Sequence, residues 1–530
     1  MANKRKRVRL ILAGILLIIM VISFSANTFF ENKVEALLKA NVPEHIETNY
    51  EAITVNIFLG RVALKNPSFN IKLKDTNLVQ SQLSMSTLSI GGISYWDYLV
   101  NKEISVGKIN FNDLQVSTYK DRKNPAKDST QKKPMALPGP IHIGKISIQD
   151  GQLSVYDSSK DSTFVHVEKL QLDLRKVLVN DSTLQNEVPL TYQSISIETD
   201  SIFLKAGDFE NLYASALTIE ENDLSLEGVL FKTKYSKAHL SKIIKTERDH
   251  IHVTIDAVNI NAIDFGKKKD TTYFSTPLLV IKQPNAQIYR DKSVADDLTF
   301  KKLYSRSIRE LPIKLTIDSI AIQNGSVTYG EKVKADNPPG VLSLSHLNVG
   351  VSNLSNTYTS PAQTTIEVQG TFMKNSPLRA TWNFDVNKTN DAFSFQGYLG
   401  TLMTSDLNVF ISPLLNVELD GEVVETHFEI TGNENQSTIN IAQNYEDINV
   451  NIFNKKHKKM KVLSGIANVF IKNNSKSEGK RIHNVNATTT RDKTKSFFNY
   501  LARNLKASLV IMYTKKEKTK KKKAKKKKLE

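Results

Sequence analysis

Few side chains in this sequence combine a type and a spacing that would support chemistry. His250 and His252 are the closest pair among the ten histidines, and in an extended segment they share one face. Asp256 falls on the same face, but a metal site needs further ligands and an outer shell that orients them. We therefore predict two solvent-facing strand residues and no metal site.

The chain also lacks the sequence patterns typical of common catalytic sites. It contains no cysteine, so disulfides, thiolate nucleophiles and thiolate metal ligands are excluded. It has no nucleophile elbow, phosphate-binding loop, His-Glu-x-x-His motif or dinucleotide fingerprint. Carboxylates are abundant, but the sequence does not indicate which of them approach each other. We predict no enzyme, no catalytic residue and no cofactor, with an enzyme acting on envelope glycans as an alternative.

A short repeated pattern organises the chain. Residues 141–157 (IHIGKISIQDGQLSVYD) alternate apolar and polar side chains on both sides of Asp150-Gly151. Residues 108–119, 279–289 and 317–329 follow the same plan. Asp-Gly between alternating segments is a hairpin signal, so we predict hairpins here and at Asp420-Gly421.

The predicted fold is mostly β: a long, curved, repetitive antiparallel sheet, shaped as a groove or a solenoid, over residues 31–470. Stacked units of this kind bury their apolar faces against neighbours. Inserted helices are expected only at residues 236–248 and 292–310. Residues 121–140 are polar and contain proline, which indicates a solvated loop.

The amino terminus combines a basic segment with an apolar run. Residues 1–9 are strongly basic, and residues 10–30 are long enough to cross a bilayer as a helix. The basic flank predicts that residues 1–9 stay in the cytoplasm and the remainder is exported. A cleaved signal peptide is the rival interpretation. The predicted anchor side chains are Leu10, Ile11, Leu12, Ile15, Leu16, Leu17, Ile18, Ile19, Val21, Ile22 and Phe24.

The carboxy terminus is predicted to be a closing module, residues 471–514, that contains an amphipathic helix. Packing on the last strands and lying on a membrane surface remain open alternatives for this helix. Its apolar residues are Phe497, Phe498, Leu501, Leu505 and Leu509. Residues 515–530 hold eleven lysines and are predicted to be disordered, with anionic lipid as the expected partner.

The net charge of +18 does not indicate nucleic-acid binding, because most of the excess lies at the two ends of the chain. The sheet itself leaves two architectures open. One is a sandwich or solenoid with a dry core, and the other is an open apolar groove filled by acyl chains. The candidate groove residues are Ile146, Ile148, Leu153, Val155, Ile281, Ile320, Ile322 and Val327.

Two regions carry a resemblance to a known family. Residues 88–119 (LSIGGISYWDYLVNKEISVGKINFNDLQVSTY) follow the apolar run, and residues 421–430, 444–450, 466–471 and 491–501 lie near the carboxy terminus. Together they resemble the AsmA-like family of bacterial envelope proteins, over nearly the whole chain apart from the lysine tail.

The resemblance implies a protein anchored in the bacterial inner membrane by one segment, with its bulk in the periplasm. It implies that phospholipid acyl chains bind in an apolar β-groove, in the manner of eukaryotic bridge-like lipid carriers. The expected function is lipid transport and outer-membrane assembly, or regulation of protein targeting to the membrane. A structural envelope scaffold with a dry core remains the main alternative.

Overall fold

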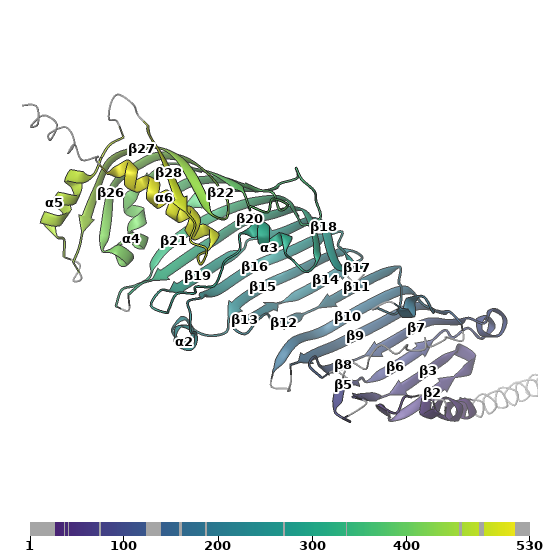
Figure 1. Cartoon of the computed structure of the whole chain (residues 1–530). Coiled ribbons are helices and arrows are strands. Elements are labelled where there is room, and N and C mark those ends of the chain that lie inside the picture. The colour runs from purple at the N-terminus through teal and green to yellow at the C-terminus, as the bar shows by residue number, and fades with distance from the viewer. Residues whose placement is uncertain are drawn as a thin grey trace, which may run out of the picture. The chain divides into compact units, whose positions relative to one another are not determined.

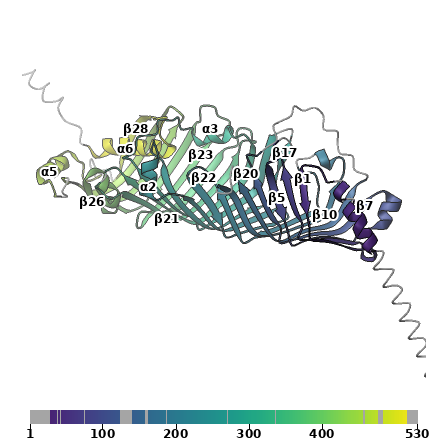
Figure 2. The same cartoon turned by 90° about the horizontal axis from the view of Figure 1, so that it is seen from below.

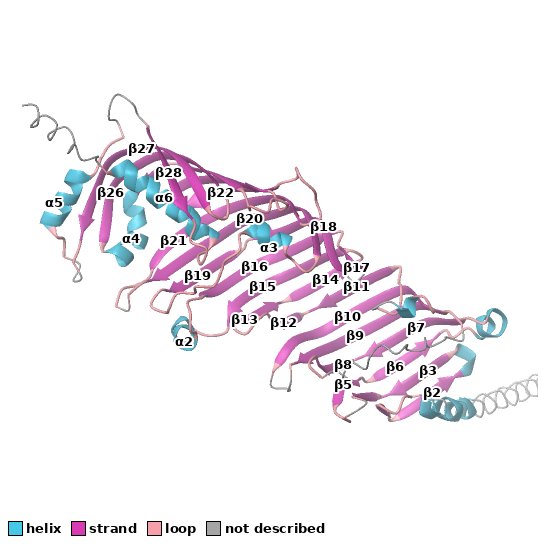
Figure 3. Cartoon of the chain, in the orientation of Figure 1, coloured by secondary structure: helices cyan, strands magenta, loops and turns pink. Residues whose placement is uncertain are grey.

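A computed structural model describes residues 27–36, 38–40, 42–73, 76–122, 139–157, 162–185, 188–268, 271–334, 336–454, 458–475 and 482–514 of the chain. The fold is mostly β, with few and short helices (Figure 3). The chain divides into two compact units, residues 1–226 and 227–530 (Figure 1). This division falls inside the region that the sequence suggested as one domain.

Unit 1 consists almost entirely of strands. They are β1 (Ile46–Asn49), β2 (Ala52–Asn56), β3 (Arg61–Lys65), β4 (Ser68–Lys72), β5 (Val79–Ser84), β6 (Thr87–Gly91), β7 (Ile104–Asn112), β8 (Gln115–Tyr119), β9 (Ile141–Tyr156), β10 (Thr163–Val179), β11 (Ser194–Thr199), β12 (Ser201–Lys205), β13 (Glu210–Ala214) and β14 (Ala216–Glu220). Short helical turns occur at Ile57–Leu59, Asp97–Asn101 and Thr183–Gln185, and residues 27–36 and 38–40 are helical. The unit boundary falls within β15 (Asp223–Thr233).

Unit 2 combines longer strands with the labelled helices. Its strands are β16 (Asp249–Asn261), β17 (Asp264–Lys268), β18 (Thr271–Lys282), β19 (Asn285–Asp291), β20 (Lys314–Lys332), β21 (Gly340–Ser355), β22 (Thr364–Phe372), β23 (Ser376–Phe384), β24 (Phe393–Leu399), β25 (Leu402–Met403), β26 (Val417–Gly432), β27 (Gln436–Ile452) and β28 (His483–Thr490). Its helices are α2 (Lys237–Ile243), α3 (Tyr304–Arg309), α4 (Asn408–Leu415), α5 (Lys461–Phe470) and α6 (Phe497–Tyr513). The two inserted helices expected from the sequence are present as α2 and α3, both shorter than predicted.

The predicted hairpins are wrong. Residues 141–156 form one strand, β9, in which Asp150 is a bulge residue with φ 51°. Asn324 in β20 has φ 50°, and Gly421 in β26 has φ 112°. Bulges and tight turns both require a residue that tolerates positive φ, so Asp-Gly and Asn-Gly cannot distinguish the two.

The other two repeats are pairs of strands that run end to end. Both β7 and β8 pair in parallel with β9, the first with its amino-terminal half and the second with its carboxy-terminal half. In unit 2, β18 and β19 pair with β20 in the same way. Each repeat therefore runs in a single direction within its sheet. It is either one strand with a bulge near its middle or two strands separated by a short break.

These pairs also correct the predicted antiparallel sheet, because the sheet in each unit is mixed. Parallel partners need a long crossover connection. Residues 120–140 connect β8 to β9, and residues 292–313, which include α3, connect β19 to β20. The polar loop predicted at residues 121–140 thus lies in a crossover, although residues 123–138 are outside the described part of the chain.

Bulges also bend strands, and Figure 2 shows the curvature of the strands within each unit. In unit 2, the strands from β22 to β28 form an antiparallel succession, interrupted only by the short β25. Helix α6 lies across β28 and β27. Its first turn is stabilised by Ser496, whose side chain accepts a hydrogen bond from the Asn499 amide at 3.3 Å.

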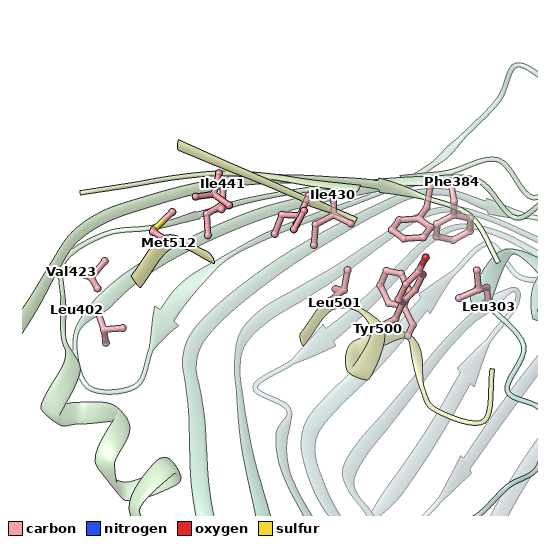
Figure 4. Close-up of a cluster of buried hydrophobic side chains, with 14 of the residues drawn as sticks. Leu303, Phe384, Leu402, Val423, Ile430, Ile441, Tyr500, Leu501 and Met512 are labelled. Carbon is pink, nitrogen blue, oxygen red and sulfur yellow. The ribbon is translucent and has the colours of Figure 1, made fainter. Parts of the chain in front are cut away.

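The cluster of buried hydrophobic side chains found among the described residues lies in unit 2, beneath α6. Figure 4 shows Tyr500 and Leu501 on the helix side of this cluster, with Ile430 and Phe384 on the sheet side. The ring of Phe497 stacks on that of Trp382, with 4.2 Å between centroids. The core of this end of unit 2 is therefore made by a helix packing on a sheet.

None of the helices in the described part of the chain has the length and apolarity needed to cross a bilayer. The predicted anchor residues, Leu10 to Phe24, lie outside the described residues, as do residues 1–9 and 515–530.

Candidate functional site

The candidate groove residues of β9 lie in apolar rows that cross unit 1. Ile146 is opposite Ile109 of β7 and Leu174 of β10. Ile148 belongs to the longest row, which runs through Ile53, Leu64, Leu88, Phe111, Ile148, Leu172, Ile197 and Ile219. Neighbouring strands thus present their apolar side chains on the same face of the sheet.

The bulge at Asp150 keeps this face continuous along β9. Side chains alternate between faces, so Ile148 and Leu153 would lie on opposite faces of a regular strand. One extra residue at the bulge shifts the alternation, because Leu172 pairs with Ile148 whereas Leu170 pairs with Gly151. Leu153 then lies between Val116 and Val167, and Val155 follows on the same face.

Unit 2 repeats this arrangement. Ile281 is opposite Val258 and Ile322, and Ile320 is opposite Leu279 and Val351. Val327 follows the bulge at Asn324 and lies between Ala286 and Leu344. The structure therefore brings together the predicted groove residues within each unit.

These apolar rows are only partly covered. All eight candidate groove residues are of intermediate exposure, and none is buried. By contrast, Ile430 and Ile439 beneath α6 have no exposed surface. Within the described part of unit 1, no helix or second sheet forms a buried core over the rows. Ile146, Ile148 and Leu153 of β9 are thus accessible to an apolar ligand.

The opposite face of β9 is polar. The Ser147 hydroxyl donates to the Asp173 carboxylate, and Lys145 Nζ lies 3.0 Å from Asp173 Oδ2. Burial would raise the pKa of Asp173, but the Ser147 and Lys145 hydrogen bonds outweigh burial and hold that pKa below its usual value. Around Ile146 and Ile148, β9 therefore presents one apolar and one polar face, as the alternation predicted.

At the covered end of unit 2, a cavity of about 400 Å³ lies between the sheet, α4 and α6. Its walls are almost wholly apolar and include Leu399, Leu402, Ile441, Ile448, Leu505 and Leu509. The polar side chains in the wall have partners within the protein: Gln443 Nε2 donates to Thr426 Oγ1 at 2.7 Å, and the Tyr513 hydroxyl donates to Gln443 Oε1 at 2.6 Å. Thr404 Oγ1 donates to the Gly421 carbonyl at 3.0 Å. Such a cavity suits an apolar chain, because no wall dipole needs a polar ligand.

The membrane-surface prediction for α6 is wrong for Phe497 and Leu501, which are buried against the sheet. Leu505 and Leu509 line the cavity, so they face the protein as well. Only Phe498 points to solvent, with 61% of its surface exposed. The sequence pattern was the same for both alternatives, because a helix that covers a sheet and a helix that lies on lipid need the same apolar stripe.

His250 and His252 are partly buried in β16. His250 Nε2 donates to the Tyr235 carbonyl at 3.0 Å, and burial lowers the pKa of His250. His252 is partly buried on the same strand, so the prediction that both face solvent is wrong. In the part of the chain that the structure describes, no group of three or more His, Asp or Glu side chains is placed to hold a metal ion.

Sequence reasoning missed the cavity and an exposed apolar surface in unit 1. Tyr95, Trp96, Tyr98, Leu99 and Val100 surround the helical turn Asp97–Asn101, and all are exposed. The segment is a helical turn whose apolar side chains point to solvent. The aromatic cluster in the sequence was the available signal.

No protein-family model matches the chain, and no curated protein matches it.

Proposed function

We propose that this protein binds phospholipid acyl chains along the partly exposed apolar rows of its sheets. We further propose that it is an AsmA-like envelope protein, anchored in the bacterial inner membrane by residues 10–30, that aids lipid transport and outer-membrane assembly. The main support is the row through Ile148, in which eight strands present apolar side chains, and the described residues bury only Leu64 among them.

The energetics favour an acyl chain as the ligand. Each buried methylene contributes about 0.8 kcal/mol, so a chain of roughly 16 carbons with half its surface covered gains on the order of 6 kcal/mol. The rows hold no charged group that would bind a headgroup, so the ligand is recognised by its tails. An acyl chain can lie across the strands without breaking backbone hydrogen bonds, because the strands are already paired and their apolar side chains already lie on one face.

The experiment is site-specific photocrosslinking in the full chain. A photoreactive residue at Ile148 or Ile322 is expected to capture phospholipid, identified by mass spectrometry. The matched controls are Gln149 and Gln323, which adjoin these positions but alternate to the opposite face and are exposed. Equal capture at Gln149, or no lipid at Ile148 and Ile322, would leave the non-transporting scaffold as the better interpretation.

A further inference from the structure

Helix α5 has the reverse of the usual amphipathic arrangement. Its polar side faces the protein: Asn468 Nδ2 donates to the Val450 carbonyl at 3.0 Å, and Asn468 Oδ1 accepts from the Val450 amide at 2.8 Å. One turn earlier, Ser464 is buried and its hydroxyl accepts from the Ile452 amide at 2.9 Å. These two side chains take the place of a neighbouring strand on the edge of β27, beyond the last residue that pairs with β28.

The apolar side of α5 faces solvent instead. Val462 is 76% exposed, and Leu463, Val469 and the adjoining Met460 are also exposed. Val462 and Val469 are seven residues apart, so they lie on the same side of the helix, away from Ser464 and Asn468. A helix of a soluble protein normally buries this side, so an exposed apolar stripe indicates a partner surface.

The charges around this stripe restrict the partner. Lys458, Lys459 and Lys461 are all exposed at the start of α5. Residues 454–473 contain no aspartate or glutamate. A second copy of the same basic surface would be repelled. An anionic bilayer, in contrast, attracts the lysines at its headgroups and accepts the apolar stripe at the boundary of its acyl chains.

We propose that α5 is a membrane-docking helix that binds the surface of an anionic lipid bilayer. The polar side of α5 stays bonded to the edge of β27. Val462 and Leu463 insert between headgroups, and the three lysines bind lipid phosphates. This docking does not require lipid binding by the apolar rows. Val450 and Ile471, which flank α5, also line the 400 Å³ cavity, so docking places that cavity beside the bilayer; a role for the cavity in lipid passage rests on the proposed function.

The absence of cysteine gives a direct test. The full chain, held in nanodiscs of zwitterionic lipid, carries Val462→Cys labelled with an environment-sensitive fluorophore. Vesicles that contain phosphatidylglycerol are expected to shift the emission to the blue, and added salt is expected to reverse the shift. The control is Leu298→Cys, an equally exposed apolar position of unit 2, which is expected not to respond.

The variant Val462→Ser/Leu463→Ser is expected to weaken vesicle binding by at least about tenfold. Leu298→Ser is the matched control and is expected to bind normally. Lipid capture at Ile148 is expected to persist in the double variant, which separates this proposal from the proposed function. A Val462 probe whose emission does not shift when vesicles that contain phosphatidylglycerol are added would overturn the proposal. So would a blue shift without vesicles that grows with protein concentration, because it would identify a self-association surface.

Discussion

Apolar rows of similar composition have different surroundings in the middle of unit 1 and at the carboxy-terminal end of unit 2. In unit 1, Ile148 lies between Phe111 and Leu172 and remains partly exposed. In unit 2, Ile439 lies between Ile430 and Ala487 and is fully buried. The strands are alike in pattern, and α6 makes the difference.

This comparison shows that alternation decides which face is apolar but not whether that face is covered. The cover is a separate element, attached through its own contacts. Where the cover is present, the sheet gains a core and an apolar cavity. Where the described residues provide none, the same chemistry leaves a surface that an apolar ligand can occupy.

The largest expected effect comes from truncating one isoleucine in each region. Ile439→Ala is expected to destabilise the protein by about 3 kcal/mol, because it opens a cavity in a closed core. Ile148→Ala is expected to cost about 1 kcal/mol, because less surface is buried there. Guanidinium unfolding measures both, with Trp382 as the fluorescent reporter for Ile439 and amide exchange of β9 for Ile148. Equal costs would show that the rows of unit 1 are covered in solution.

A smaller effect is expected from the ion pairs that hold the start of α6. Glu247 lies 2.6 Å from Lys292 Nζ and 3.1 Å from Lys495 Nζ. Burial would raise the pKa of Glu247, but the two lysines outweigh burial and hold that pKa below its usual value. This stabilisation is present above the unfolded pKa of about 4.3 and is lost as the pH falls through the lower folded value.

Glu247→Gln is therefore expected to cost about 2 kcal/mol at pH 7 and to show a weaker loss of stability on acidification. Unfolding curves at several pH values measure the difference between the two proteins. A constant difference down to the lowest pH would contradict the ionic origin of the effect.

A methyl group added at the bulge in β9 is expected to lower the stability of the protein by an intermediate amount. In Gly151→Ala the new Cβ would lie 2.8 Å from Ile148 Cγ2 and 3.1 Å from the Leu170 carbonyl oxygen. We expect a cost of about 1–2 kcal/mol and increased amide exchange along β9. Gly350→Ala in β21 is the control, because no atom lies within 4 Å of its new Cβ. A neutral Gly151→Ala would mean that the bulge repacks freely.

The smallest effect is expected at the outer side of α6. Phe498→Ser is expected to change the free energy of unfolding by less than about 0.5 kcal/mol, since Phe498 faces solvent. Leu501→Ser, one turn later on the buried side, is expected to cost several times more. Thermal unfolding distinguishes the two, and a similar loss for both would mean that α6 is rotated about its axis.

Much of the architecture followed from the sequence because period-two alternation is a local property. It predicted the mostly β fold and the apolar side of β9 and β20. The hairpins were mispredicted because Asp150-Gly151 and Asn324-Gly325 satisfy the positive-φ requirement of a turn and of a bulge alike. The parallel pairing of β7 with β9 depends on a crossover whose course is not encoded in the strands themselves.

The cover over the last strands was harder to predict for a related reason. The spacing of Phe497, Leu501 and Leu505 indicates only that one side of α6 is apolar. Whether that side contacts protein or lipid depends on strands far away in the sequence, such as β24 and β26. The inverted orientation of α5 also depends on tertiary contacts, since Ser464 and Asn468 contact the part of the β27 edge that β28 does not cover.

The extra residue at Asp150 has a consequence for how the chain tolerates insertions and deletions. Removing that one residue would rotate Leu153 and Val155 to the hydrophilic side while Ile146 and Ile148 stay in place. A second change of one residue within the following few positions would restore the original orientation. Length changes in these strands should therefore be accepted in compensating pairs on either side of each bulge, and rejected singly.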